Sequence, residues 1–297
     1  MLNATSRNAA KNICAMTELA RIIRLFRGSG IPVIVIKGAA LAETVYDNIG
    51  EREFSDLDIL VKEADIAKAV ETLLDEGYQR AEQSQYYFIN GISAVDLHSS
   101  LPHTRLMEEV WREAVPALLG GEETLLISPE ENIIYLSYHS AVQHADPDVK
   151  WLMDIDRIVR RASSLKGIDW DLLREKAGKN KLRIPVYWFL KRTCERFHTP
   201  IPEKILNELK PRRSMRSAIF ERITGESPPL AADYLSLVLM RPGRIFKALF
   251  PRVEAIENRY GAKRPFAYVF YFVRPFELLF ELTRDIFSFL KRPGRRA

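Results

Sequence analysis

The chain has 297 residues, with 44 basic and 39 acidic side chains, and 47% of its residues are hydrophobic. This composition is typical of a globular protein of one or two domains and excludes a disordered or low-complexity chain. The two cysteines, Cys14 and Cys194, lie far apart and outside any CxxC motif, which argues against a disulfide framework or a cysteine zinc site. The sequence shows no signal peptide and no apolar run near the roughly 20 residues of a membrane-spanning helix. We therefore expect a cytoplasmic protein without a transmembrane segment.

The N-terminal part of the chain mixes helical and strand patterns. In chain order, the predicted elements are a helix over 6–27, a strand over 32–36, a helix over 39–47, a strand over 57–61, a helix over 63–76, and strands over 86–89 and 92–97. Asn90-Gly91 separates the last two strands and favours the positive φ angles of a hairpin turn. This mixture predicts an α/β or α+β sheet domain.

After Gly120-Gly121 the strand signals fade, and residues 129–290 show mostly helical periodicity interrupted by prolines. The sequence therefore predicts an α+β protein with two domains. The first, 1–120, is a small mixed-sheet domain with an N-terminal helix. The second, 121–297, is mainly helical and ends in a basic, aromatic tail.

Acidic residues on two predicted strands are the main candidates for chemistry. Asp56 and Asp58 begin a strand, and because strand side chains alternate, both point to the same face while Leu57 points to the core. Two carboxylates on one face can share a hard divalent cation, although acidic pairs are also common on surfaces. If its strand is a neighbour, Asp96 joins them as the third carboxylate of a two-metal phosphoryl-transfer site.

Lys37, Gly38 and Ala39 lie where a strand is predicted to pass into a helix. Gly38 permits close backbone approach, the helix N-terminus offers free N–H groups, and Lys37 adds a positive charge. These features would suit a triphosphate. The alternative for Lys37 is a surface lysine at a strand end.

The segment IKGAALAETVYDNIGEREFSDLDILV, followed by VDLHSSL, resembles the bacterial uncharacterised nucleotidyltransferases, a branch of the superfamily related to DNA polymerase beta. The resemblance extends to Lys150-Trp151-Leu152 and Arg259-Tyr260 and so covers most of the chain. It implies transfer of a nucleoside monophosphate from a nucleoside triphosphate, ATP among them, with pyrophosphate release. It also implies a Mg²⁺ cofactor, with Mn²⁺ as a substitute. The acceptor stays open: a sugar phosphate, another small molecule, a peptide, a protein or RNA.

Carried over residue by residue, the resemblance implies that Asp56 and Asp58 hold metal. Asp96 would complete the metal site or accept the proton of the nucleophile. Where the superfamily usually has Ser or Gly after the glycine of the turn, this chain has Ala39, so Lys37 or Arg52 is expected to supply the phosphate contact. This departure also supports the alternative of a nucleotide-binding or scaffold protein without catalysis.

Two basic residues are assigned to nucleotide binding with alternatives open. Arg52 is equally expected to form an ion pair with Glu51 or Asp56. Lys150 either reaches phosphate or the acceptor from a helix that lines the cleft, or pairs with Asp154 four residues later.

Histidines offer further candidates. His98 shares a strand face with Asp96, so it contacts substrate, donates a hydrogen bond to that carboxylate, or simply ends the strand. His139 and His144, with aspartates nearby, are the basis of a minor alternative, a His/Asp metal phosphohydrolase.

The tail combines charge with aromatic residues. Residues 201–297 hold 19 basic and 10 acidic side chains, and aromatic residues are interleaved with Arg and Lys. Core packing is the first interpretation, because aromatic residues at helical spacing usually face a core. Peripheral contact with the inner face of the membrane is the second, and single-stranded nucleic acid the third.

Overall fold

The computed structural model describes residues 3–81, 84–91, 93–144, 149–211, 253, 256, 264–273, 276 and 277. Its α-helices are α1 (Ala4–Gly28), α2 (Lys37–Thr44), α3 (Ile66–Asp75), α4 (Met107–Arg112), α5 (Pro129–Tyr138), α6 (Val149–Ser163), α7 (Trp170–Lys179), α8 (Arg183–Phe197) and α9 (Glu203–Leu209). Its strands are β1 (Val33–Ile36), β2 (Asp56–Val61), β3 (Gln79–Arg80), β4 (Tyr87–Ile89), β5 (Ala94–His98), β6 (Val115–Leu119) and β7 (Glu122–Leu126). Short helical turns are η1 (Ile49–Glu51), η2 (Glu63–Asp65), η3 (His139–His144, a π-helix) and η4 (Phe266–Val269).

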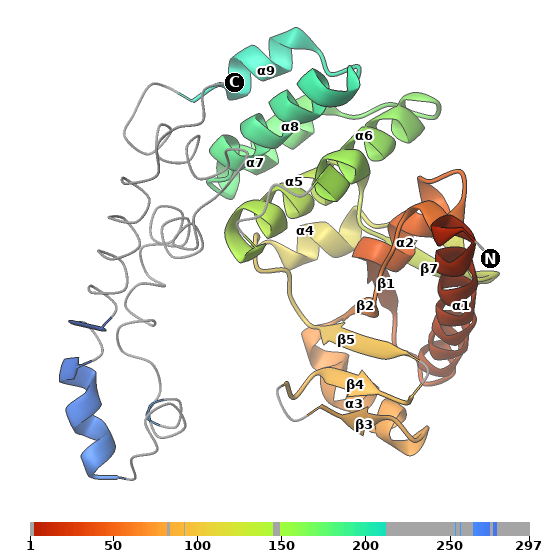
Figure 1. Ribbon diagram of the computed structural model, residues 1–297, viewed down its shortest axis with the longest axis vertical. Helices are drawn as coiled ribbons and strands as arrows, with labels where there is room; N and C mark the ends of the chain where they lie inside the picture. Colours follow the sequence, from red (N-terminus) through yellow and green to blue (C-terminus); the bar gives the residue numbers. More distant parts are fainter. Residues whose placement is uncertain are drawn as a thin grey trace.

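The strands form one mixed sheet in the order β3-β4-β5-β2-β1-β7-β6 (Figure 1). The central strand β2 pairs antiparallel with β1 and parallel with β5, and β1 pairs parallel with β7. The predicted α+β fold with a mixed sheet is confirmed. All the predicted strands are present, including the hairpin of β4 and β5. The connection is a four-residue loop between Ile89 and Ala94, and among its described residues Gly91 alone has a positive φ.

Both faces of the sheet are covered, because apolar residues of β1 and β2 alternate between two separate clusters. On one face, side chains of α1, α2 and α3 pack against Val33, Val35, Leu57 and Ile59. On the other face, α4 and α5 cover the strand residues Ile34, Ile36 and Leu60. The second face is also that of Asp58, which alternates with Leu57 and Ile59.

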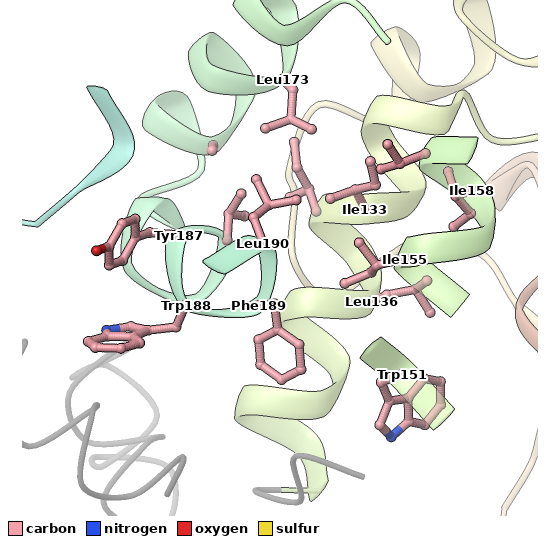
Figure 2. Packing of buried hydrophobic residues seen from close by; sticks show 14 of the residues in the cluster. Ile133, Leu136, Trp151, Ile155, Ile158, Leu173, Tyr187, Trp188, Phe189 and Leu190 are labelled. Carbon is pink, nitrogen blue, oxygen red and sulfur yellow. The ribbon is translucent and has the colours of Figure 1, made fainter. Parts of the chain in front are cut away.

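A third core joins the helices α5 to α9. Figure 2 shows side chains from α5 (Ile133, Leu136), α6 (Trp151, Ile155), α7 (Leu173) and α8 (Phe189, Leu190) packed together. Leu41 of α2 and Tyr46, which follows it, belong to the same cluster. The helical layer therefore packs directly against α2 and the residues that follow it.

The prediction that strands end at Gly120-Gly121 is wrong. These two glycines, both at positive φ, turn β6 into β7, and β7 lies beside β1 within the sheet. The polar start of β7, Glu-Glu-Thr, hid the alternating pattern that marks a strand. The sheet thus extends past residue 120, and the division into two domains stays a prediction.

Gly38 is required for packing. A Cβ at this position would fall well inside van der Waals contact with the Cβ of Phe54. We expect Gly38→Ala to lower the free energy of unfolding by about 1–3 kcal/mol through overpacking, measured by urea denaturation. Gly28, with open space around its Cβ position, is the matched control, and Gly28→Ala should cost nothing. An unchanged urea midpoint for Gly38→Ala would contradict this role.

Most of the basic, aromatic tail lies outside the described residues. Among the described tail aromatics, Phe266, Phe272 and Phe276 are 73%, 79% and 73% exposed, whereas Phe270 and Tyr271 are half-buried. Core packing of the tail stays a prediction. Within the described part of the chain, no helix is long and apolar enough to cross a membrane.

Candidate active site

Asp58 and Asp96 lie side by side at the centre of the sheet. They are register partners on the parallel strands β2 and β5, and His98 follows two residues later on the same face as Asp96. The three side chains offer ligand atoms that all lie within 4.8 Å of one another. The prediction that Asp96 joins the acidic pair of β2 is confirmed for Asp58, because the parallel register places the two carboxylates opposite each other.

Two basic side chains converge on one oxygen of Asp58. Lys37 Nζ lies 2.5 Å from Asp58 Oδ1, and His98 Nε2 lies 2.9 Å from the same atom and 3.2 Å from Asp96 Oδ2. The Asp58 side chain is 3% exposed, whereas that of Asp96 is 29% exposed. Asp58 is thus the buried carboxylate of the site, and Asp96 is the carboxylate that solvent reaches.

The backbone at Lys37 has an unusual conformation. Lys37 has a φ of 56°, in the left-handed region that a residue with a Cβ adopts at a cost of about 1–2 kcal/mol. It joins β1 to α2 without an intervening loop, one residue after Ile36, the register partner of Asp58. The short connection places Lys37 beside Asp58, and strain of this kind is typical of functional positions.

The charges of the site shift its pKa values in opposite directions. Burial raises the pKa of Asp58, but the hydrogen bond from His98 and the charge of Lys37 outweigh it, so the pKa lies below its usual value. Burial lowers the pKa of His98, but its bonds to Asp58 and Asp96 raise it to about 9. His98 is therefore an imidazolium at neutral pH, and Lys37, whose pKa is also raised, is an ammonium. Two cations neutralise two carboxylates.

Asp56 is a third carboxylate at the edge of this group. It is not among the three residues whose ligand atoms cluster, and its Oδ1 accepts a hydrogen bond from Ser55. Burial and the negative charge of Asp58 raise its pKa, so the two carboxylates interact. The metal-binding role of Asp56 stays a prediction.

The donor set suits a hard divalent cation. Mg²⁺ and Mn²⁺ prefer carboxylate oxygen, and imidazole is a further ligand for Mn²⁺ and other transition metals. Asp58 and Asp96 would supply the oxygens from adjacent strands, and His98 would supply a nitrogen once its imidazolium has lost a proton. The group therefore fits a divalent cation, provided that Asp58 exchanges its basic partners for the ion.

The sequence analysis missed two tyrosines at the site. Tyr87 of β4 is the register partner of Asp96, and burial together with the charges of Asp56 and Asp96 raises its pKa. Tyr135 of α5 is buried next to Lys37, where burial is the largest cause of its raised pKa and Lys37 opposes it. Only the strand register and the packing of α5 on the sheet bring these residues here.

The turn after β1 does not expose Ala39. Ala39 is fully buried in the cluster under α1, so its side chain faces the core, away from the Asp58 side of the sheet. The position at which the sequence departs from the expected Ser or Gly therefore lies in this core cluster. Contact of Gly38 and Ala39 with nucleotide stays a prediction, resting on the backbone at the start of α2.

Arg52 has a partner that the sequence did not suggest. Its Nε and Nη2 donate to the two oxygens of Asp154 at 2.8 and 2.9 Å, and the Tyr46 hydroxyl donates to Asp154 Oδ1 at 2.7 Å. The ion pair is buried, and the Arg52 guanidinium lies over the Trp151 ring. The partner of Arg52 is therefore Asp154, and the prediction of an ion pair with Glu51 or Asp56 is wrong. The pair ties the loop before β2 to α6, and a nucleotide contact by Arg52 stays a prediction.

Lys150 lies in the first turn of α6, and His139 packs against the same helix through Trp151. Lys150 is exposed and its Nζ lies 4.9 Å from the centre of the Trp151 ring. Its contact with nucleotide stays a prediction. His139 is buried between the rings of Tyr135 and Trp151. Among the described residues His139 is not part of the group with metal-ligand spacing. The side chain of His144 and the aspartates that follow it lie outside the described part, so the phosphohydrolase alternative stays a prediction.

Comparisons with known proteins show the family of the chain. Among solved structures, the antibiotic-resistance factor ANT(2'')-Ia is similar, with 14% sequence identity and a TM-score of 0.39, over 62% of this chain and 95% of that one. No curated protein matches the chain. Residues 1–198 match the family described as uncharacterised nucleotidyltransferase, which spans the sheet, the acidic cluster and the helices up to α8. The chain belongs to this uncharacterised nucleotidyltransferase family.

Proposed function

We propose that this nucleotidyltransferase moves a nucleoside monophosphate from a nucleoside triphosphate to an acceptor in a Mg²⁺-dependent reaction that releases pyrophosphate. The observation that carries the proposal is the placement of Asp58 and Asp96 as register partners on adjacent parallel strands, beside His98 and Lys37. Paired carboxylates of this kind hold the divalent cations of phosphoryl-transfer sites.

Asp58 and Asp96, with Asp56 beside them, would hold the cation. When bound, the cation neutralises charge on the phosphates and on the leaving pyrophosphate. Asp58 is buried and fixed by the sheet, so it is suited to orient the cation. Asp96 is more exposed and lies next to the open side of the site.

The proposed reaction forms one bond to the α-phosphorus and breaks another, and residues of this chain take the proton and bind the phosphates. An acceptor oxygen attacks the α-phosphorus, the bond to the bridging α,β-oxygen breaks, and that oxygen leaves with pyrophosphate. In this proposal Asp96 accepts the proton of the acceptor hydroxyl. Lys37, at the start of α2, binds a phosphate oxygen, which the N-terminal amides of the helix also favour. Arg52 and Lys150 are proposed as further nucleotide contacts.

A labelled-substrate assay tests the proposal. The full chain is incubated with each of the four α-labelled triphosphates, ATP first, and Mg²⁺ or Mn²⁺, with sugar phosphates, other small molecules, peptides, proteins and RNA as acceptors. We expect pyrophosphate release with at least one acceptor and its loss in Asp58→Asn. Bound nucleotide without pyrophosphate release would favour the non-catalytic binding protein, and release that persists in Asp58→Asn would contradict the assignment of the site.

We also propose that the enzyme is cytoplasmic and that its tail contacts anionic membranes. The net charge of 201–297 is positive, with 19 basic and 10 acidic residues, and Phe266 and Phe272 are largely exposed. Exposed aromatic residues next to basic ones suit the interface of an anionic bilayer. We expect co-sedimentation with phosphatidylserine-containing vesicles, weakened about tenfold or more by Phe266→Ser with Phe272→Ser, since a buried Phe contributes about 1.5–3 kcal/mol. Equal binding by the double variant, or equal binding to phosphatidylcholine vesicles, would refute the contact.

A further inference from the structure

Lys37 is paired with a carboxylate of the candidate metal-binding group. Its Nζ lies 2.5 Å from Asp58 Oδ1, the same atom that His98 Nε2 approaches to 2.9 Å. Asp58 is also a member of the group with metal-ligand spacing. A divalent cation and an ammonium on the same carboxylate repel each other strongly here, because Asp58 is buried and screening by water is weak. Binding of the cation to Asp58 therefore favours movement of Lys37 away from that carboxylate.

Lys37 is able to move without any change in the backbone. A lysine carries its compact charge on a flexible four-carbon stem, so the head can swing while the stem stays in place. Its side chain is 15% exposed, compared with 3% for Asp58, so one side of the lysine is open. Lys37 is also the first residue of α2, whose free N–H groups favour an anion at the same place. The displaced ammonium would thus remain where phosphate is best stabilised.

The left-handed backbone of Lys37 supports a functional role. Glycine would adopt a φ of 56° without cost, and the chain nevertheless has a lysine there. The strained conformation directs the side chain from the end of β1 toward Asp58. A charge that only neutralised a buried carboxylate could be supplied from a relaxed position, so the placement suits a group that must serve both Asp58 and the substrate.

Resting on the nucleotidyl transfer proposed above, we propose that Lys37 is an exchangeable counter-ion. It pairs with Asp58 while no divalent cation is bound, and it moves to a phosphate oxygen of the nucleoside triphosphate when the cation takes Asp58. Each ligand then helps the other: the cation releases Lys37 for phosphate, and phosphate keeps Lys37 away from Asp58. This coupling is reciprocal, so metal and nucleotide raise each other's affinity by the same factor. The charge exchange keeps the metal-binding carboxylate neutralised before substrate arrives.

Mn²⁺ binding followed by electron paramagnetic resonance tests the exchange without any turnover. Affinity is measured for the full chain alone and with saturating α,β-methylene analogues of the four nucleoside triphosphates. In Lys37→Met the competitor for Asp58 is gone, so we expect Mn²⁺ alone to bind about tenfold more tightly than in wild type. The analogue should raise Mn²⁺ affinity in wild type and should lose most of this effect in Lys37→Met. Lys37→Gln, which keeps an amide near Asp58 without the charge, should behave in the same way.

Controls separate this inference from the proposed function. Lys11→Met removes an exposed lysine paired with Glu53 and should change neither affinity. Asp58→Asn should abolish Mn²⁺ binding. If it does, and folded Lys37 variants bind Mn²⁺ no more tightly than wild type or keep the full effect of the analogue, the exchange is overturned while the metal site stands. Absence of Mn²⁺ binding in wild type with every analogue would overturn both.

Discussion

Replacing Asp58 with asparagine is expected to lower the rate of nucleotidyl transfer by about a thousandfold or more. Asp58 is the buried carboxylate at the centre of the acidic group, and an amide lacks the charge needed to hold a divalent cation. A bound metal contributes several kcal/mol of transition-state stabilisation, and about 4 kcal/mol corresponds to a thousandfold in rate. The measurement is pyrophosphate release under single-turnover conditions with saturating nucleotide and Mg²⁺. Asp96→Asn should show a loss of similar size, because Asp96 lies opposite Asp58 in the strand register.

The control for Asp58→Asn must account for stability. Lys37 and His98 both pair with Asp58, so the substitution leaves two buried cations with fewer partners. We expect a loss of roughly 1–3 kcal/mol in the free energy of unfolding. Combining Asp58→Asn with Lys37→Met should recover most of this stability and none of the activity. Recovery of transfer in the stable double variant would show that the carboxylate is not needed.

Replacing Asp154 with alanine is expected to lower the free energy of unfolding by about 3–5 kcal/mol. The substitution leaves the Arg52 guanidinium buried without its carboxylate and removes the acceptor of the Tyr46 hydroxyl. Burial raises the pKa of Asp154, and Arg52 only partly offsets this. Each charge of the buried pair is therefore unfavourable when its partner is removed. The expected fall in Tm is roughly 6–20 °C, measured by calorimetry and checked by urea denaturation.

The matched control removes both charges. A buried ion pair can often be replaced by apolar side chains at little cost, so Arg52→Met with Asp154→Leu should lose clearly less stability than Asp154→Ala, the remaining loss being that of the acceptor of the Tyr46 hydroxyl. Asp156 lies on the same helix as Asp154 but accepts hydrogen bonds from Arg160 and Thr199 instead, so it offers a second comparison. Its partner Arg160 is half exposed, so Asp156→Ala should cost less than Asp154→Ala. Equal losses for the two alanine variants would contradict a special role for the Arg52 pair.

The sequence identified the strands of the site because their signals are local. Side chains in a strand alternate, so Asp56, Leu57 and Asp58 could be assigned to faces from order alone. The same reasoning placed Asp96 and His98 on one face of β5. Strand β7 escaped because three of its five residues, Glu-Glu-Thr, interrupt that alternation, and its burial depends on pairing with β1.

The partners of these residues could not be read from local pattern. Arg52 and Asp154 are separated by 102 residues, and nothing near Arg52 distinguishes Asp154 from the closer acids. Tyr135 and Tyr87 are ordinary aromatic residues in their own elements, and only the packing of α5 and the pairing of β4 with β5 place them beside the acids.

The sequence by itself determined the alternation of helices and strands, the acidic faces of two strands and the family resemblance, because each depends on residues close together in the chain. The tertiary structure alone decided that Asp58 and Asp96 are register partners, that Lys37 and His98 share one oxygen of Asp58, and that Arg52 belongs to Asp154. The physical reason is that the packing of the sheet and helices sets the pairing of distant segments. It also decides which residue of opposite charge lies next to a buried charge.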